Sequence, residues 1–406
     1  MTQISPLFSN KLSQSVKTPI KFGANDNAKV DFTTKSDSID LSTKKFDKKK
    51  ILKYGAIGVA FLGLAAGVAA LIKKGKVPAE ILSVQKSAND MEKEALSLAE
   101  DVQKTIDDEI KPLQESAEKL AEEVKGRAEK IKSEVTELFN NGGKNKEGTQ
   151  VATISKNDNL SLMAEFDSEG KPVRISGFNE YGYIKHFQES SDNGVKIYKF
   201  SITGDIQAYQ DGAEHLPDGT HKAANGFSFL DNDTCVYSQG IEQLEDGTKK
   251  TAKMLITKDG EIVEYAKDTV DLPDFNQKTA KSFIYRDGAL SEYIEDFEKL
   301  SDDSEKTAKV LTFYNGQVSN YNKSGERIQG QSDKYAKYID LEDGKVAEYI
   351  EGFEERSDNT IKYAKNLSFI DGEPVSYVEG FEAMPDNDMK IAKSIVKEGS
   401  KWVEKH

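Results

Sequence analysis

Residues 277–304 read QKTAKSFIYRDGALSEYIEDFEKLSDDS, and the chain after about residue 195 consists largely of copies of this unit. A tyrosine marks each copy and recurs every 28 residues, at Tyr209, Tyr237, Tyr265, Tyr293, Tyr321, Tyr349 and Tyr377. An Asp-Gly or Asn-Gly pair precedes five of these tyrosines, and the motif Lys-x-Ala-Lys opens each later copy. Self-similarity at a fixed period predicts small supersecondary units that stack on one another.

Each copy has the pattern of one β-hairpin. The turn pairs are Asp259-Gly260, Asp287-Gly288, Asn315-Gly316, Asp343-Gly344 and Asp371-Gly372. These dipeptides tolerate the positive φ that a type I′ turn needs at both central residues. Before the turn, apolar residues such as Phe283 and Tyr285 alternate with others, which is typical of a strand with one apolar face. The segment that carries the tyrosine then returns as the second strand.

A single hairpin buries too little surface to be stable in water, so the copies must share a sheet. We therefore predict a mainly β repeat array over residues 195–406, built as an open twisted meander. A β-propeller with two copies in each four-stranded blade is the alternative. Residues 151–194 hold less regular strand material, and we expect a degenerate hairpin there that caps the array.

Charge is distributed unevenly along the chain. Residues 1–53 contain 11 lysines against 5 aspartates, a net charge of +6, which leaves −20 for the remainder of a chain whose total is −14. An acidic body repels nucleic-acid phosphates, so we expect no nucleic-acid partner. The single cysteine, Cys235, excludes an internal disulfide framework.

The amino-terminal region predicts a membrane anchor. Residues 1–50 are polar and lysine-rich and are expected to form a disordered basic tail, whereas residues 54–72 contain no charged residue. Nineteen helical residues span about 28 Å, close to the thickness of a bilayer core. We therefore predict a transmembrane helix over residues 51–74, although a buried core helix or the apolar part of a signal peptide would have the same composition. More lysines precede the span than follow it, so we expect a single-pass protein with a cytoplasmic amino terminus and the repeats outside.

Gly63 and Gly67 form a G-x-x-x-G pattern within this apolar segment. Small residues at this spacing let helix backbones approach closely in lipid, so the pair is a candidate helix-packing site. The alternative is that glycine and alanine are simply common in such segments.

Residues 78–141 predict an amphipathic helical stalk. Apolar residues from Val84 to Leu138 recur at an average of 3.6 positions, and Pro112 should kink the helix. This stripe needs a partner: a second chain in a coiled coil, the folded-back second half of the stalk, or the membrane surface. In composition, residues 54–139 resemble YtxH-like membrane-anchored helical proteins.

The segments FIYRDGALSEY (283–293) and FYNGQVSNY (313–321) are similar to MORN-variant repeats. The shared pattern is an aromatic residue, an Asp/Asn-Gly turn and a returning strand that ends in tyrosine. The resemblance implies a hairpin array and no particular activity, and this chain departs from it in its 28-residue period and its Lys-x-Ala-Lys motif.

Sequence motifs for catalysis, cofactors or metals are absent. The four histidines, at positions 186, 215, 221 and 406, follow no metal-ligand spacing, and there is no phosphate-binding glycine loop. We therefore expect no enzymatic activity, no cofactor and no metal site.

Two series of lysines from the Lys-x-Ala-Lys motif are the main candidate binding residues. They are Lys250, Lys253, Lys278, Lys281, Lys306, Lys309, Lys334, Lys337, Lys362 and Lys365. Equal spacing predicts two basic ladders on the sheet, which could bind an anionic polymer. The alternative is that the lysines pair with neighbouring glutamates and protect the sheet against aggregation.

These features predict a membrane-anchored protein that displays a β-hairpin surface for binding an unidentified protein or polymer. The alternative is a structural tether or scaffold that self-associates through its helical stalk.

Overall fold

The computed structural model describes residues 77–140, 152–157, 160–166, 171–179, 183–192, 194–230, 233–385 and 388–405. All of them belong to one compact unit, Lys76–His406. The predicted tail, the apolar segment 54–72 and the pair Gly63 and Gly67 lie outside the described residues.

Twenty-one strands form a single antiparallel sheet within the described residues. The first strands are β1 (Ala152–Asn157), β2 (Leu160–Phe166), β3 (Pro172–Phe178), β4 (Ile184–Ser191), β5 (Gly194–Phe200), β6 (Ile206–His215), β7 (His221–Phe229), β8 (Thr234–Gln243), β9 (Lys249–Lys258) and β10 (Glu261–Asp271). The remaining strands are β11 (Gln277–Arg286), β12 (Ala289–Lys299), β13 (Glu305–Tyr314), β14 (Gln317–Ile328), β15 (Ser332–Glu342), β16 (Lys345–Arg356), β17 (Ile361–Ile370), β18 (Glu373–Ala383), β19 (Met389–Lys390), β20 (Lys393–Glu398) and β21 (Lys401–Lys405).

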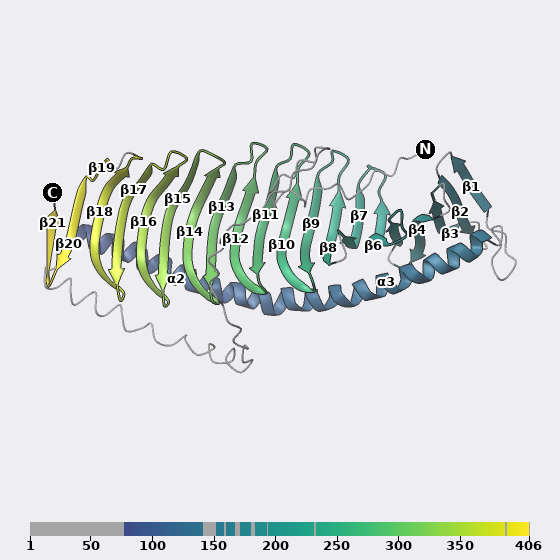
Figure 1. Ribbon diagram of the computed structural model, residues 1–406, viewed down its shortest axis with the longest axis horizontal. Coiled ribbons are helices and arrows are strands. Elements are labelled where there is room, and N and C mark those ends of the chain that lie inside the picture. The colour runs from purple at the N-terminus through teal and green to yellow at the C-terminus, as the bar shows by residue number, and fades with distance from the viewer. Residues whose placement is uncertain are drawn as a thin grey trace, which may run out of the picture. The chain divides into compact units, whose positions relative to one another are not determined.

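The sheet is an open meander, as predicted. From β1 to β18 consecutive strands pair with each other, and β18 pairs with both the short β19 and β20. At the two ends, β1 pairs only with β2 and β21 only with β20 among the described residues (Figure 1). The sheet therefore does not close, and the propeller alternative is wrong.

The hairpin turns are also confirmed. Both residues of each predicted pair have positive φ, for example 53° at Asp259 and 80° at Gly260. Positive φ at both central positions defines the type I′ turn, whose twist matches that of the flanking strands.

One helical rod follows residue 78 and consists of α2 (Ala79–Thr105), the π-helical turn η5 (Ile106–Ile110) and α3 (Lys111–Asn140). Pro78 precedes the first helical residue. Figure 1 shows the three segments running on from one another along the row of strands. The π turn comes immediately before the predicted kink site at Pro112, which lacks the N–H needed for a regular helical hydrogen bond.

The apolar stripe of this helix is buried as predicted, but its partner is different from those expected. Residues such as Val84, Met91, Ile110 and Ile131 belong to one hydrophobic core with the sheet tyrosines. The coiled-coil stalk is therefore corrected: the helix packs against the sheet of its own chain. The sequence did not reveal this because the stripe records only that a partner exists.

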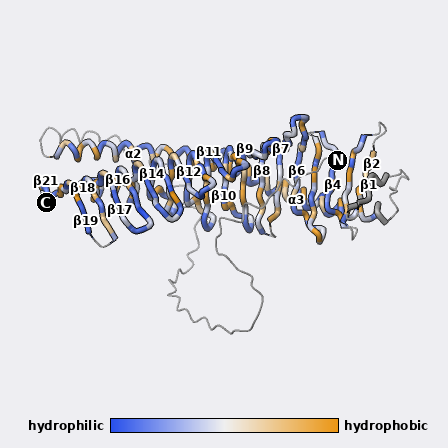
Figure 2. The backbone as a smooth tube through the Cα atoms, turned by 90° about the horizontal axis from the view of Figure 1, so that it is seen from above, coloured by the Kyte–Doolittle hydropathy of each residue, from blue (hydrophilic) through white to orange (hydrophobic). Residues whose placement is uncertain are grey.

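The repeat tyrosines form the sheet side of this core. In register, they alternate with Phe227, Leu255, Phe283, Leu311, Ile339, Leu367 and Ile395. The seven tyrosines are at most 4% exposed. Phe283 packs edge-on against both Tyr265 and Tyr293, with ring centroids 5.5 and 4.9 Å apart. This row is called the tyrosine row below. Figure 2 shows apolar residues recurring along successive strands of the sheet.

Successive repeats meet the helix at intervals of seven residues in α2. Tyr321 and Tyr349 hydrogen-bond with Glu94 and Ser87. Burial raises the pKa of Tyr293 and Tyr377, and the charges of Asp101 and Glu80 raise it further. Seven helical residues rise about 10.5 Å, and the two strands of one hairpin occupy about 9.6 Å of sheet. Seven residues of the helix and one hairpin of the sheet therefore cover nearly the same distance.

A close approach of two strands explains why the third position of Lys-x-Ala-Lys is an alanine. Across from it on the neighbouring strand lies a residue with positive φ, such as Gly240 (60°), Asp268 (54°) or Gly352 (66°). A Cβ on Gly240 would lie 2.8 Å from the Cβ of Ala252, so the two backbones come very close there. A larger residue than alanine would collide with the neighbouring strand.

The prediction of a single-pass membrane protein is also corrected. Across the described residues, no helix combines the length and the apolar character needed to cross a membrane.

Candidate functional site

The structure aligns the predicted lysine ladders but places carboxylates between the lysines. In the first series, Lys250, Lys278, Lys306, Lys334 and Lys362 lie 2.7–3.9 Å from Glu242, Glu298, Glu326, Glu354 and Glu382 respectively. The result is a row of alternating charge across the sheet. Such pairs are partly exposed and stabilise the sheet only modestly.

The second lysine series lies beside the helix. Lys253 contacts Glu109 at 3.4 Å, and Lys309 contacts Glu94 at 3.7 Å and Glu295 at 3.1 Å. Lys365 lies 3.1 Å from Glu351, whereas Lys281 and Lys337 are aligned in register with Glu295 and Glu351. This series therefore helps to hold the helix on the sheet.

Glu94 and Glu109 are the main polar anchors of the helix. Tyr321 donates a hydrogen bond to Glu94 at 3.0 Å, and Lys323 lies 2.8 Å from the same carboxylate. Tyr265 and Lys267 contact Glu109 at 3.2 and 3.1 Å. Burial is the largest single effect and raises the pKa of both carboxyls. The hydrogen bonds and positive charges of the neighbouring lysines, with the Tyr321 hydroxyl at Glu94, together outweigh it, so the pKa of each carboxyl is lowered.

The opposite side of the sheet carries two rows that flank the tyrosine row, since neighbours in a strand point to opposite faces. One row contains Gln210, Gly226, Ser238, Met254, Ala266, Ser282, Ile294, Val310, Asn322, Tyr338, Ile350, Asn366 and Val378. The other contains Ala208, Ser228, Val236, Ile256, Glu264, Ile284, Glu292, Thr312, Asn320, Asp340, Glu348, Ser368 and Ser376. These two rows are called the rear face.

The rear face contains four carboxylates and neither lysine nor arginine. Burial raises the pKa of Glu264, whose nearest hydroxyl donor is Ser282 at 3.5 Å. The other three accept hydrogen bonds, from Arg286 to Glu292, Tyr338 to Asp340 and Asn366 to Glu348. Arg286, next to the rows, thus neutralises Glu292, and the two rows are otherwise acidic and rich in uncharged polar groups.

Three polar atoms of the rear face have no hydrogen-bond partner among the described residues. They are Nε2 of Gln210, Oδ1 of Asn322 and Oγ of Ser228, and their residues are at most 9% exposed. Buried polar groups are nearly always hydrogen-bonded in proteins, so these atoms are candidates for contacts with another molecule.

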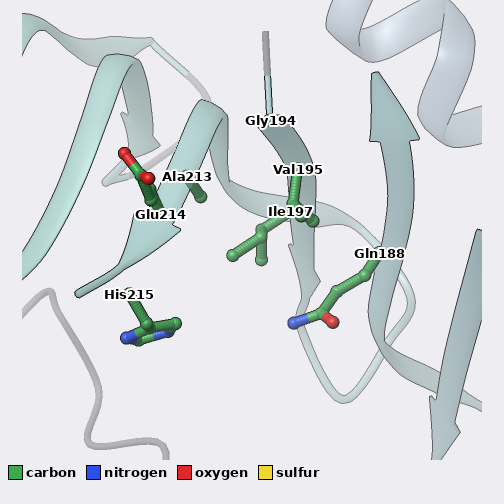
Figure 3. A pocket seen from close by; sticks show the side chains of 7 residues that line it. All are labelled: Gln188, Gly194, Val195, Ile197, Ala213, Glu214 and His215. Atoms are coloured by element: carbon green, nitrogen blue, oxygen red, sulfur yellow. The ribbon is translucent and has the colours of Figure 1, made fainter. Parts of the chain in front are cut away.

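A pocket of about 530 Å³ lies among strands β4, β5 and β6 (Figure 3). Gln188, Val195, Ile197, Glu214 and His215 contribute to its lining. His215 also meets His221 across the β6–β7 hairpin, with 3.3 Å between their Nδ1 atoms. These histidines follow no motif in the sequence, but six residues across a turn suffice to bring two side chains together.

Among the described residues there is no group of three His, Cys, Asp or Glu side chains arranged to hold a metal ion. Cys235, the single cysteine of the chain, is partly exposed. His186 is largely buried, and burial together with the charge of Lys199 lowers its pKa to about 4.

No protein-family model matches the chain, and no curated protein matches it either. The resemblances to MORN-variant repeats and to YtxH-like proteins therefore stay predictions. Among solved structures, the chain is similar to a porin-like protein from Bacteroides uniformis, at 9% identity and a TM-score of 0.15. The match covers 61% of this chain and 95% of that protein, and a score this low supports no conclusion.

Proposed function

We propose that the protein is a binding protein without enzymatic activity, whose rear face holds an extended partner that carries hydrogen-bonding groups and positive charge. The observation that carries this proposal is that one row of the rear face holds four carboxylates, Glu264, Glu292, Asp340 and Glu348. Neither row of the rear face contains lysine or arginine. Opposite charge across an interface steers association and selects the partner.

The geometry of the rows favours an extended partner over a compact one. Neighbouring strands offer equivalent positions at intervals of about 4.8 Å. A linear molecule lying across the strands would meet polar groups in succession, including Gln210 Nε2 and Asn322 Oδ1, which have no hydrogen-bond partner among the described residues. Satisfying such buried groups favours binding because leaving them unpaired costs free energy.

The test is titration of the untagged full chain with soluble poly-L-lysine, a neutral glucan and poly-L-glutamate, followed by calorimetry. One variant removes the rear-face charge through E264Q, E292Q, D340N and E348Q. The control variant removes the same charge from the alternating row through E242Q, E298Q, E326Q and E354Q. The proposal requires the rear-face variant to weaken poly-L-lysine binding about tenfold or more, and the control to change it much less.

Equal weakening by both variants would show general electrostatic attraction and would contradict the proposal. Binding of poly-L-glutamate in place of poly-L-lysine would instead support the lysine ladders as the binding surface.

A structural tether or scaffold is the second candidate. It is favoured by the tyrosine row, which joins the hairpins from Tyr209 to Tyr377 into one core with the helix. Such a spacer would bind none of the three polymers. Self-association through the helical stripe is no longer needed to explain that stripe, because the sheet covers it.

A further inference from the structure

The pair formed by His215 and His221 occupies a position that varies among the repeats, and some later repeats hold a hydrogen-bonded pair there. These residues face each other as the last pair of the β6–β7 hairpin. The equivalent positions two repeats later hold Asp271 and Gln277, and two repeats after that they hold Arg327 and Asp333.

In those later hairpins the facing side chains complement each other. Gln277 donates a hydrogen bond to Asp271 at 2.9 Å, and Arg327 donates one to Asp333 at 3.1 Å. At the first of these positions two imidazoles meet instead. One neutral ring can donate an N–H···N hydrogen bond to the other. When neither Nδ1 carries a proton, both lone pairs are available to a shared cation.

The geometry of the pair suits a shared cation. Leu216 N–H donates to the Thr220 carbonyl at 2.8 Å just beyond the pair, which brings the two neighbouring side chains close together. The two Nδ1 atoms lie 3.3 Å apart. Two nitrogens bound at about 2.05 Å to a tetrahedral ion would be separated by about 3.3 Å.

One ring of the pair is buried and the other is exposed, so the pair is both fixed in place and reachable from solvent. His221 is only 5% exposed and its Nε2 has no hydrogen-bond partner among the described residues, so one ligand is held inside the hairpin. His215 is exposed and borders the pocket, through which an ion can reach the pair. Figure 3 shows the Glu214 carboxylate pointing away from the His215 ring, so Glu214 does not complete the site.

We infer that His215 and His221 together bind one divalent first-row transition ion, such as Cu²⁺, Ni²⁺ or Zn²⁺, through their Nδ1 atoms, with water in the remaining positions. Imidazole is a preferred ligand of these ions. Two protein ligands give a weak, exchangeable site, which is consistent with the absence of a third ligand residue among the described residues.

The test is calorimetric titration of the untagged full chain with NiCl₂ and, separately, with ZnCl₂. The matched variant H215D/H221Q copies the Asp271–Gln277 pair and so keeps a hairpin-closing hydrogen bond. It is expected to bind at least tenfold more weakly than the natural chain, as are H215N and H221N. Circular dichroism melts establish that each variant is folded.

The reciprocal variant D271H/Q277H installs the histidine pair two repeats later and is expected to add a second equivalent of bound metal. The inference is overturned if H215D/H221Q binds as tightly as the natural chain. It is also overturned if the natural chain binds neither metal.

Discussion

Glu94 and Glu109 make equivalent contacts with tyrosines two repeats apart, although the two glutamates are separated by fifteen helical residues. Their partners, Tyr321 and Tyr265, lie 56 residues apart. Two intervals of seven would need fourteen residues, as between Glu80 and Glu94. The extra residue lies where the helix widens into the π turn Ile106–Ile110. A π turn lets a helix accommodate one inserted residue while the apolar stripe on both sides of it keeps facing the sheet.

Deleting Asp108 from the π turn should therefore be tolerated better than deleting Asp90 from α2. The first deletion removes the extra residue, whereas the second rotates one end of α2 by about 100° and exposes its apolar stripe. We expect the Asp90 deletion to cost at least about 2 kcal/mol more than the Asp108 deletion. Urea unfolding followed by circular dichroism measures both, and equal losses would contradict this role of the π turn.

The close approach at Gly240 predicts that Gly240→Ala destabilises the protein more than Gly260→Ala. Gly240→Ala places a Cβ 2.8 Å from that of Ala252 at a φ of 60°, whereas Gly260→Ala, at a φ of 80°, meets nothing within 4 Å. Both variants carry the cost of a left-handed backbone, about 1–2 kcal/mol. Only the first adds a collision, which should cost about 1–3 kcal/mol more. Thermal melts of the two variants provide the comparison, and similar losses would show that the strands separate at little cost.

The repeats predict the hairpins, their turns and the open sheet because these features depend on local residues such as Asp259 and Gly260. The apolar period from Val84 to Leu138 likewise predicts which helical residues are buried. What covers those residues could not be predicted, because the match between seven helical residues and one hairpin appears only when both repeats are placed in space. The lysines illustrate the same limit: equal spacing gives the ladder, but whether Lys309 faces solvent or Glu94 depends on the helix.

Acid should destabilise the protein through His186. Its pKa of about 4 in the folded state lies below the usual value of 6.5, so the unfolded chain binds more protons between these values. Stability is therefore fully present above pH 6.5 and is lost as the pH falls towards 4, by up to about 3 kcal/mol.

His186→Asn removes this titration and leaves that of the carboxylates. The difference in unfolding free energy between the two proteins should change between pH 7 and pH 4, with the natural chain losing more. Parallel pH profiles from urea unfolding would rule out this assignment.

Removing one repeat should require removal of one helical heptad as well. Deleting residues 277–304 alone takes out one hairpin, about 9.6 Å of sheet, and leaves the helix about 10.5 Å too long. Residues on one side of the deletion, such as Glu94, would then face the wrong tyrosine. A chain that also lacks residues 95–101 restores the pairing of Glu94 with Tyr321 and of Glu109 with Tyr265.

We expect this double deletion to unfold in one cooperative transition within about 5 °C of the natural melting temperature. The hairpin deletion alone is expected to melt lower or in two steps. A matched control removes residues 95–99, so that the helix is shortened by five residues instead of seven and the apolar stripe is rotated. If the single and double deletions melt alike, the helix does not follow the hairpins in step, and the contacts of Glu94 and Glu109 are independent of each other.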